Sequence, residues 1–342
     1  MSDIVRVTQL ASMLAEHGVP GVAVAIAEGP GTPVQTFCAG VASTKGAQAI
    51  DPDTVFEAAS LSKPCFALAV LRLVDLGQLA LDEPLSNYFP SVSNEEQGLQ
   101  RITARHVLSH SSGLPNVSSS DQPIRARFPA GERFSYSGEG FVYLQKCVEH
   151  VTRQPLDAVM RRLVLDPLGM TRSDYVWREG FAPNHASPHD EELRRQPKSQ
   201  PSAANAASSL HTTVTDFAAF LAAVLSGGLL QPATADLWLS PDVYVPLGAV
   251  GSLETEANPA TNPHVAWGLG WGLEPGAGTF FQWGANDGFR AFTMGSVRAR
   301  TAVVALTNGD AGLRLAARTC AATFAGERPA LTWLNLDRPR KS

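Results

Sequence analysis

The sequence predicts an α+β fold, in which an antiparallel β-sheet flanked by helices is built from both ends of the chain and carries a mostly helical insertion. Short strand-like apolar runs occur near the N-terminus and again near the C-terminus, and helical patterns joined by long polar loops fill the middle. We therefore expect residues 1–79 and 261–342 to form one sheet domain together and residues 80–260 to form a mostly helical domain. The functional site is expected in the cleft between them.

The N-terminal part predicts a helix, a hairpin of two strands and a second, longer helix. These elements are expected at residues 4–17, 21–28, 34–41 and about 60–76. Gly29-Pro30-Gly31 is the hairpin turn, and Gly77 closes the long helix. Pro64 falls in the first turn of that helix, where a missing N–H breaks no intrahelical hydrogen bond.

The middle and C-terminal parts predict helices joined by long loops and then a return to strands. The two longest loops, residues 116–130 and 182–207, are rich in Pro, Ser, Asn and charge, which is typical of lids or mobile segments. Residues 216–225 form an apolar helix of the core. The later elements are strands at 266–273, 278–283, 289–297 and 301–308, and a helix at about 311–324.

Composition excludes several classes of partner. The chain has 342 residues, of which 44% are hydrophobic and 17% charged, and a net charge of −5. A core of ordinary size is therefore available, and no basic stripe suits a nucleic acid. No run is long enough to span a membrane, and the first residues lack the basic start and apolar run of a secretory signal. We expect a cytoplasmic protein with no nucleic-acid or membrane partner, and the sequence leaves its oligomeric state open.

Ser60 and Lys63 form the most informative pair in the chain. The sequence has five lysines, and Lys63 alone follows a serine by three residues. On a helix this spacing puts both side chains on the same face. A neutral lysine amine can remove the proton of a serine hydroxyl and make it a nucleophile.

The four cysteines predict neither a metal site nor a disulfide framework. Cys38, Cys65, Cys147 and Cys320 lie far apart, and no C-x-x-C or His/Cys cluster occurs. Cys65, although close to Ser60, is interpreted as a small buried core residue. No metal and no organic cofactor is predicted.

Four further segments resemble motifs of the serine β-lactamase-like family, which includes class C β-lactamases, penicillin-binding proteins and family VIII carboxylesterases. They are His106-Val-Leu-Ser-His-Ser-Ser-Gly-Leu-Pro115, Pro129-Ala-Gly-Glu-Arg-Phe-Ser-Tyr-Ser-Gly138, Asp166-Pro-Leu-Gly-Met170 and Trp267-Gly-Leu-Gly-Trp271. Their order and spacing match over nearly the whole chain. The resemblance implies the β-lactamase/transpeptidase fold, which agrees with the pattern above.

The resemblance also implies roles for individual residues. Ser60 aligns with the acylated serine, Lys63 with the base on the same helix, and Tyr136 with the tyrosine of the second motif. A charged Lys63 is expected to ease the ionisation of Tyr136, so that the two titrate as a coupled pair. The backbone N–H groups of Ser60 and Ala285 are expected to form the oxyanion hole.

Two departures from the family pattern bear on the substrate. Gly138 stands where an asparagine usually contacts the acyl side chain of peptide-like substrates. Gln282 stands at the usual cationic position of the third motif, which family members carry on an edge strand. A glutamine has no charge with which to bind a carboxylate, so the sequence favours a neutral acyl substrate.

The remaining candidate substrate contacts lie in the same C-terminal segment. Trp283 is expected to form an aromatic wall, or alternatively to pack in the sheet. Gly284 lets the strand approach the ligand closely, and Asn286 belongs to the same group. Arg290 is either a nearby cation or a solvated strand residue. In the segment 106–115, His110 is expected to be structural rather than catalytic.

The preferred hypothesis is a serine hydrolase that forms an acyl-enzyme on small esters or amides, most like a family VIII carboxylesterase. One alternative is a β-lactamase, a D-alanyl-D-alanine carboxypeptidase or a D-aminopeptidase. Another is an acyltransferase, in which an alcohol or amine replaces water. A third, a binding protein without catalysis, is disfavoured because Ser60, Lys63, Tyr136 and Gly284 occur together.

Overall fold

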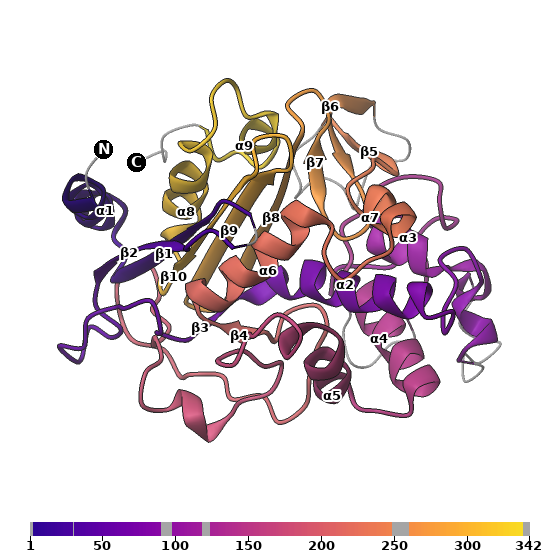
Figure 1. The fold of residues 1–342 in the computed structure, drawn as a ribbon, viewed down its shortest axis with the longest axis horizontal. Coiled ribbons are helices and arrows are strands. Elements are labelled where there is room, and N and C mark those ends of the chain that lie inside the picture. Colours follow the sequence, from indigo (N-terminus) through magenta and orange to yellow (C-terminus); the bar gives the residue numbers. More distant parts are fainter. Residues whose placement is uncertain (1–2, 30, 90–97, 118–123, 248–259, 338–342) are drawn as a thin grey trace.

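A computed structural model describes residues 3–29, 31–89, 98–117, 124–247 and 260–337. An antiparallel sheet of eight strands lies at the centre, in the order β2-β1-β10-β9-β8-β7-β6-β5 (Figure 1). Its strands are β1 (Gly21–Ala27), β2 (Gln35–Gly40), β5 (Val243–Pro246), β6 (Thr261–Trp267), β7 (Gly272–Glu274), β8 (Thr279–Asn286), β9 (Phe289–Ser296) and β10 (Thr301–Thr307). Because β1 pairs with β10, both ends of the chain share one sheet, as the sequence predicts.

Helices cover both faces of this sheet. In β1, Val22 and Val24 point into one apolar cluster, and Ala23 and Ala25 point into the other. The valine face lies under α1 (Asp3–His17), α8 (Gly312–Ala321) and α9 (Pro329–Trp333), whereas the alanine face packs against α6 (Val214–Ser226), which crosses in front of the sheet in Figure 1. The small alanines let α6 approach closely. Burial on both faces explains why these strands are continuous apolar runs rather than alternating ones.

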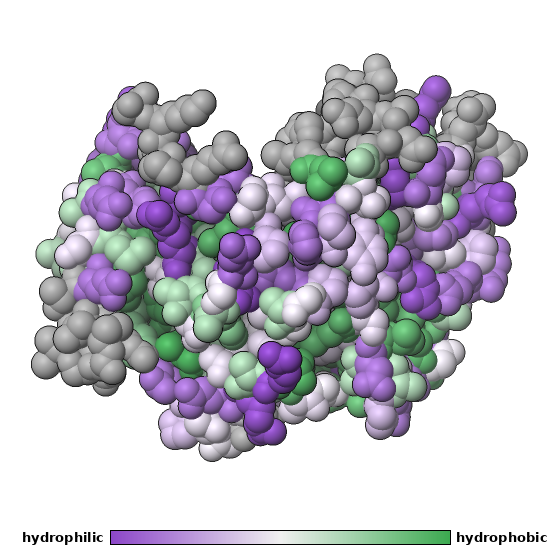
Figure 2. Space-filling view, turned by 90° about the horizontal axis from the view of Figure 1, so that it is seen from above, coloured by the Kyte–Doolittle hydropathy of each residue, from purple (hydrophilic) through white to green (hydrophobic). Residues whose placement is uncertain are grey.

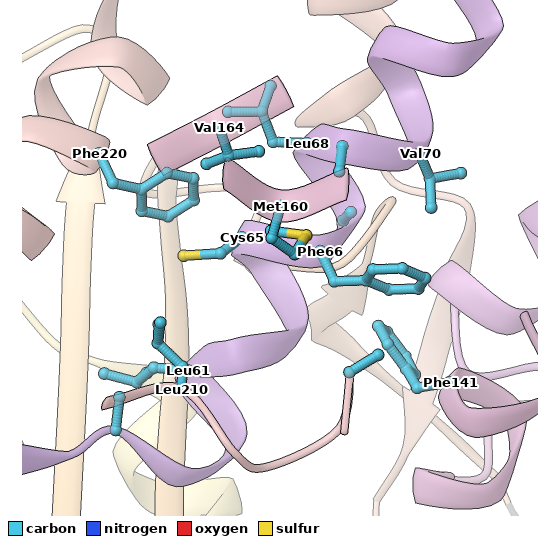
Figure 3. Close-up of a cluster of buried hydrophobic side chains, with 14 of the residues drawn as sticks. Leu61, Cys65, Phe66, Leu68, Val70, Phe141, Met160, Val164, Leu210 and Phe220 are labelled. Carbon is cyan, nitrogen blue, oxygen red and sulfur yellow. The ribbon is translucent and has the colours of Figure 1, made fainter. Parts of the chain in front are cut away.

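The apolar cluster that contains Ala23 and Ala25 is organised around α2 (Ser62–Asp75). Every residue from Cys65 to Leu71 is fully buried, so this stretch of the helix is apolar on all sides, as expected of a helix inside a core. Figure 3 shows its side chains among Phe141, Met160, Val164 and Phe220. Cys65 is one of them, which confirms its interpretation as a core residue.

In the helical part, the helices pack on α2 or on one another. Its helices are α3 (Ala104–Leu108), α4 (Gly138–Thr152), α5 (Leu156–Met160), a π-helical turn (Arg161–Leu165), α7 (Pro232–Trp238) and 3-10 turns at Leu85–Asn87, Leu99–Arg101 and Glu179–Phe181. A short antiparallel pair, β3 (Phe56–Glu57) and β4 (His211–Thr212), lies outside the main sheet. Residues 182–207 form neither a helix nor a strand, as predicted for this loop. Part of the other predicted loop, residues 118–123, lies outside the described residues.

Three features differ from the sequence-based prediction. Residues 266–273 are not one strand, because Gly270, with a φ of 92°, turns the chain between β6 and β7. A side chain at Gly270 would place its Cβ 2.5 Å from that of Ala67, so the turn packs directly on α2. In addition, β5 was not predicted, and both β5 and α6 come from the segment 80–260 but pack in or on the sheet. The division into two domains stays a prediction.

The surface is mixed in character. Figure 2 shows hydrophilic and hydrophobic residues interspersed on the face seen from above. Within the described ranges, none of the helices combines the length and apolar character needed to cross a bilayer.

Candidate active site

Ser60 lies in a tight turn immediately before α2. The structure corrects the predicted helix start: Ala59–Leu61 form a 3-10 turn, and α2 begins at Ser62. Ala59 has a φ of 50°, a left-handed conformation that costs a non-glycine residue on the order of 1–3 kcal/mol. Ser62 holds this turn, because its buried hydroxyl donates to the Ala59 carbonyl at 2.5 Å and accepts from the Leu210 N–H at 2.9 Å. The sharp turn leaves Ser60 partly exposed at the helix N-terminus.

Lys63 contacts the Ser60 hydroxyl directly. Its Nζ lies 3.0 Å from Ser60 Oγ and 2.8 Å from the carbonyl oxygen of Ala207. The side chain is buried, and burial lowers the pKa of Lys63 from its ordinary value to about 7. A substantial fraction of this amine is therefore neutral near neutrality, with one N–H held by Ala207 and a lone pair available to Ser60.

Tyr136 completes the group. Its phenol is hydrogen-bonded with the side chains of Ser60 and Gln282, and its ring centre lies 5.0 Å from Lys63 Nζ. Burial nevertheless raises the pKa of Tyr136 to about 12, with these hydrogen bonds opposing the rise. The expectation that Lys63 would ease ionisation of the phenol is thus wrong: Tyr136 is buried and Lys63 itself loses charge in the same environment.

His110 supports Tyr136. The two rings stack with centroids 4.1 Å apart, and His110 Nδ1 accepts a hydrogen bond of 3.0 Å from the Ser137 N–H. Burial and the nearby Lys63 hold the pKa of His110 well below its usual value. The imidazole is therefore neutral, and it packs beside the candidate site, which favours the structural role expected from the sequence.

Strand β8 passes directly beside the serine. A Cβ at Gly284 would lie 2.5 Å from the Ala58 carbonyl oxygen and 3.2 Å from the Ser60 amide nitrogen. β8 is an interior strand rather than the expected edge strand, but β7 pairs only with its first residues, Thr279 to Phe281. Residues 282–286 therefore pair with β9 on one side and with no described strand on the other. This arrangement brings the Ala285 backbone near Ser60, and its oxyanion role stays a prediction.

Gln282 lies next to Tyr136 and Ser60. It is fully buried, and its Nε2 donates to Tyr136 Oη at 2.8 Å. The same nitrogen lies 3.0 Å from the carbonyl oxygen of Trp283 and 3.4 Å from that of Ser60. The residue predicted as a substrate contact thus bonds to protein groups of the site.

Trp283 and Gly138 shape the surroundings of Tyr136. Trp283 is partly exposed, and its ring lies 4.8 Å from the Tyr136 ring, centroid to centroid, so it forms a wall beside the phenol. Gly138 begins α4, where a Cβ would lie 2.5 Å from the backbone oxygen of Asn116. The absence of an asparagine at this position therefore has a steric reason.

Two predicted substrate contacts are engaged elsewhere. Asn286 Nδ2 donates to Glu57 Oε2 at 2.9 Å and to the Ser208 carbonyl at 3.3 Å. Arg290 forms an ion pair of 2.8 Å with Asp310 and donates to the Asn286 carbonyl. Their polar groups bond to the protein itself, and a direct role of either residue in substrate binding stays a prediction.

The structure adds a buried ion pair that the sequence did not reveal. Lys198, from the loop 182–207, lies 2.5 Å from Glu57 Oε1 and 3.0 Å from His211 Nε2. Glu57 in turn accepts from Asn286, so this polar cluster joins the loop, β3, β4 and β8. Only the rarity of lysine in the sequence could have drawn attention to Lys198.

Comparisons with known proteins agree with this geometry. A model of the Beta-lactamase family matches residues 8–323. Penicillin-binding protein 4 of Amycolatopsis lactamdurans is 28% identical over 281 residues, which are 75% of this chain and 72% of that protein. Esterase EstB of Burkholderia gladioli is 32% identical over 188 residues, 46% of this chain and 47% of that protein.

Solved structures give the same fold. The octameric penicillin-binding protein homologue from Pyrococcus abyssi superposes with a TM-score of 0.77 at 22% identity, covering 94% of this chain and 77% of that one. A class C beta-lactamase superposes with a TM-score of 0.75 at 18% identity, covering 95% of this chain and 96% of the other. At these identities the likeness concerns the fold alone, and it confirms the predicted arrangement of sheet and helices.

Proposed function

The chain belongs to the beta-lactamase family, and on this premise we propose that it is a serine hydrolase that forms an acyl-enzyme at Ser60 on small esters or amides. The activity proposed is most like that of a family VIII carboxylesterase. Its partner is a small uncharged ester or amide, and the reaction uses no metal or organic cofactor.

The observation that carries this proposal is the contact between Lys63 and Ser60. A buried amine with a pKa of about 7 lies 3.0 Å from a partly exposed hydroxyl. Proton transfer from Ser60 Oγ to neutral Lys63 leaves a nucleophilic oxygen at a helix N-terminus, where backbone N–H groups favour developing negative charge. Water then hydrolyses the acyl-enzyme.

The preference for an uncharged substrate rests on Gln282 and Arg290. The amide of Gln282 brings no charge, and the guanidinium of Arg290 is neutralised by Asp310. A substrate carboxylate would lose its water at this site without gaining a cation from either residue. The partly exposed ring of Trp283 instead offers an apolar surface to an acyl or alcohol group.

A second candidate function is hydrolysis of β-lactams or D-amino-acid peptides. It is favoured by the likeness to Penicillin-binding protein 4, which covers three quarters of this chain. The same acyl-enzyme would serve it, so only the substrate distinguishes the two functions.

The proposal is tested with wild type and Ser60→Ala against p-nitrophenyl butyrate, a chromogenic cephalosporin and a D-amino-acid amide. We expect turnover of the ester alone, loss of that turnover in Ser60→Ala, and labelling of Ser60 by an alkyl fluorophosphonate in the intact-mass spectrum. Ser86→Ala, which changes a partly exposed serine outside the site, is the matched control.

Each other outcome has a definite meaning. Rapid cephalosporin turnover without ester turnover would select the second candidate. Formation of a new ester when a small alcohol is added would indicate acyl transfer. Equal ester turnover by Ser60→Ala and wild type would refute the proposed function.

A further inference from the structure

The carbonyl oxygen that holds Lys63 belongs to a tight turn distant from it in the sequence. Ala207 supplies this oxygen, 2.8 Å from Lys63 Nζ, within residues 204–209, which we call the acceptor turn. Asn205 shapes the turn, because its Oδ1 accepts from the Ala207 N–H at 2.8 Å and its carbonyl accepts from the Ser208 N–H at 3.2 Å. These residues lie in neither a helix nor a strand, so the place of the turn relative to Lys63 depends on contacts with neighbouring elements.

Gln145 of α4 fixes the first half of the acceptor turn. Its buried amide bonds to the turn twice: Nε2 donates to the Ala204 carbonyl at 2.9 Å, and Oε1 accepts from the Ala206 N–H at 2.9 Å. Only one amide orientation satisfies both partners, because an N–H can only donate and a carbonyl can only accept. Nε2 also donates to Glu149 Oε1 at 3.2 Å, so the amide is itself held in place.

Asn286 of β8 fixes the second half of the acceptor turn. Its Nδ2 donates to the Ser208 carbonyl at 3.3 Å and to Glu57 Oε2 at 2.9 Å. Glu57 lies three residues before Ser60 in the chain, and Asn286 directly follows Ala285. One amide nitrogen thus links the acceptor turn to the segment that carries the nucleophile and to the strand beside it.

We propose that Gln145 and Asn286 are positioning residues for the base of the reaction. Together they hold the Ala207 carbonyl where it accepts one N–H of Lys63, and this contact turns the lone pair of the amine toward Ser60. This inference rests on the proposed function. A lysine amine ends a flexible chain of four carbons, so it acts as a base on Ser60 only while a fixed acceptor keeps it from turning away.

Removal of each amide tests the proposal. Gln145→Met keeps the length of the side chain and removes both bonds to the acceptor turn, and Asn286→Ala removes the donor to Ser208. We expect kcat for p-nitrophenyl butyrate to fall by about 10- to 10²-fold in each variant and KM to stay within about twofold, since a misplaced base slows the chemical step and not substrate binding. Unchanged kcat in both variants would overturn the proposal.

Gln154→Met is the matched control. Gln154 is a partly exposed glutamine whose Oε1 accepts from Arg162 Nε, and it has no printed bond to the acceptor turn. Its substitution should change neither kcat nor KM. A fall in kcat equal to that of Gln145→Met would overturn the specific role of the amide at position 145.

A double-mutant cycle with Lys63→Met separates positioning from a structural role. If Gln145 acts through Lys63, its loss has no further effect once the amine is gone, so Lys63→Met with and without Gln145→Met should have the same residual kcat within about twofold. If Gln145 only maintained the fold, Gln145→Met would slow both backgrounds by the same factor, and that result would overturn the positioning role. Should Gln145→Met fail to fold, Asn286→Ala, on a partly exposed side chain, carries the same cycle.

Failure of this inference is distinguishable from failure of the proposed function. Labelling of wild-type Ser60 by the fluorophosphonate tests the acyl-enzyme whatever holds the acceptor turn. Labelled Ser60 together with unchanged kcat in both amide variants would reject the roles of Gln145 and Asn286 alone. Absence of labelling, with full ester turnover by Ser60→Ala, would reject both.

Discussion

Burial of a few residues decides the chemistry of the site. Lys63 and Tyr136 lie in the same apolar surroundings, yet burial moves the pKa of the amine down to about 7 and that of the phenol up to about 12. Both shifts favour the uncharged form, because a low-dielectric site penalises whichever form carries charge. Burial thus favours a neutral amine beside a neutral phenol next to Ser60.

The pairing of Ser60 with Lys63 could be predicted from the sequence, because one helical turn fixes its geometry. The protonation states of Lys63 and Tyr136 could not be predicted, because they depend on how deeply each side chain is buried. The ion pair between Arg290 and Asp310 could not be predicted either, since the two residues are brought together only by the fold.

Gly138 gives a prediction at the scale of one residue. A Cβ here would lie 2.5 Å from a backbone oxygen, which cannot move as a flexible side chain can. We expect Gly138→Ala to lower the free energy of unfolding by about 1–3 kcal/mol in urea denaturation. Gly180→Ala is the control, since nothing lies within 4 Å of its Cβ position. Equal stabilities of the two variants would contradict the steric reading of this position.

At the scale of elements, the nucleophile turn and β8 act as one unit. The strained Ala59 turn presents Ser60, and Gly284 allows β8 to lie against it. The sequence predicted both elements, because apolar runs and glycines mark them. The prediction placed the helix start two residues too early, because a 3-10 turn has the same apolar spacing over three residues. The prediction joined β6 and β7 into one strand, because a single glycine turn between apolar residues hardly interrupts the apolar pattern of the sequence.

Gly284→Ala tests this unit. The added methyl group would meet the Ala58 carbonyl and push β8 away from Ser60. We expect kcat/KM for p-nitrophenyl butyrate to fall by at least about tenfold, since a small misplacement at a reacting centre is costly. Circular dichroism should be unchanged. Gly276→Ala, in the turn before β8 where the Cβ position is open, should keep full activity, and the same activity in both variants would argue against the close approach.

At the scale of the whole molecule, segments distant in the sequence meet around Ser60. The sheet unites both ends of the chain, and the Glu57–Lys198 pair ties a long loop to β3 and β8. Apolar periodicity predicted the sheet and its flanking helices. It could not predict the ion pair, because a lysine in a polar loop gives no sign of being buried.

Lys198→Met tests that connection. Both partners of the pair are nearly inaccessible, so removing the cation leaves the Glu57 carboxylate buried and uncompensated. We expect a loss of about 3–5 kcal/mol in the free energy of unfolding, partly recovered when Glu57→Gln is added. Arg194→Met, which breaks an exposed pair with Asp190, should leave stability unchanged. If both single variants were equally stable, the buried pair would not hold the loop.

The most direct test of the account is the pH dependence of kcat/KM for p-nitrophenyl butyrate, a substrate without a titratable group, from about pH 5 to about pH 9. Neutral Lys63 is the base, so the rate should rise with an apparent pKa of about 7 and level off above it. Lys63→Met should lose this limb together with at least about 10²-fold in rate. A flat profile in wild type, or a Lys63→Met variant that keeps both the limb and the rate, would contradict the claim that a neutral lysine activates Ser60.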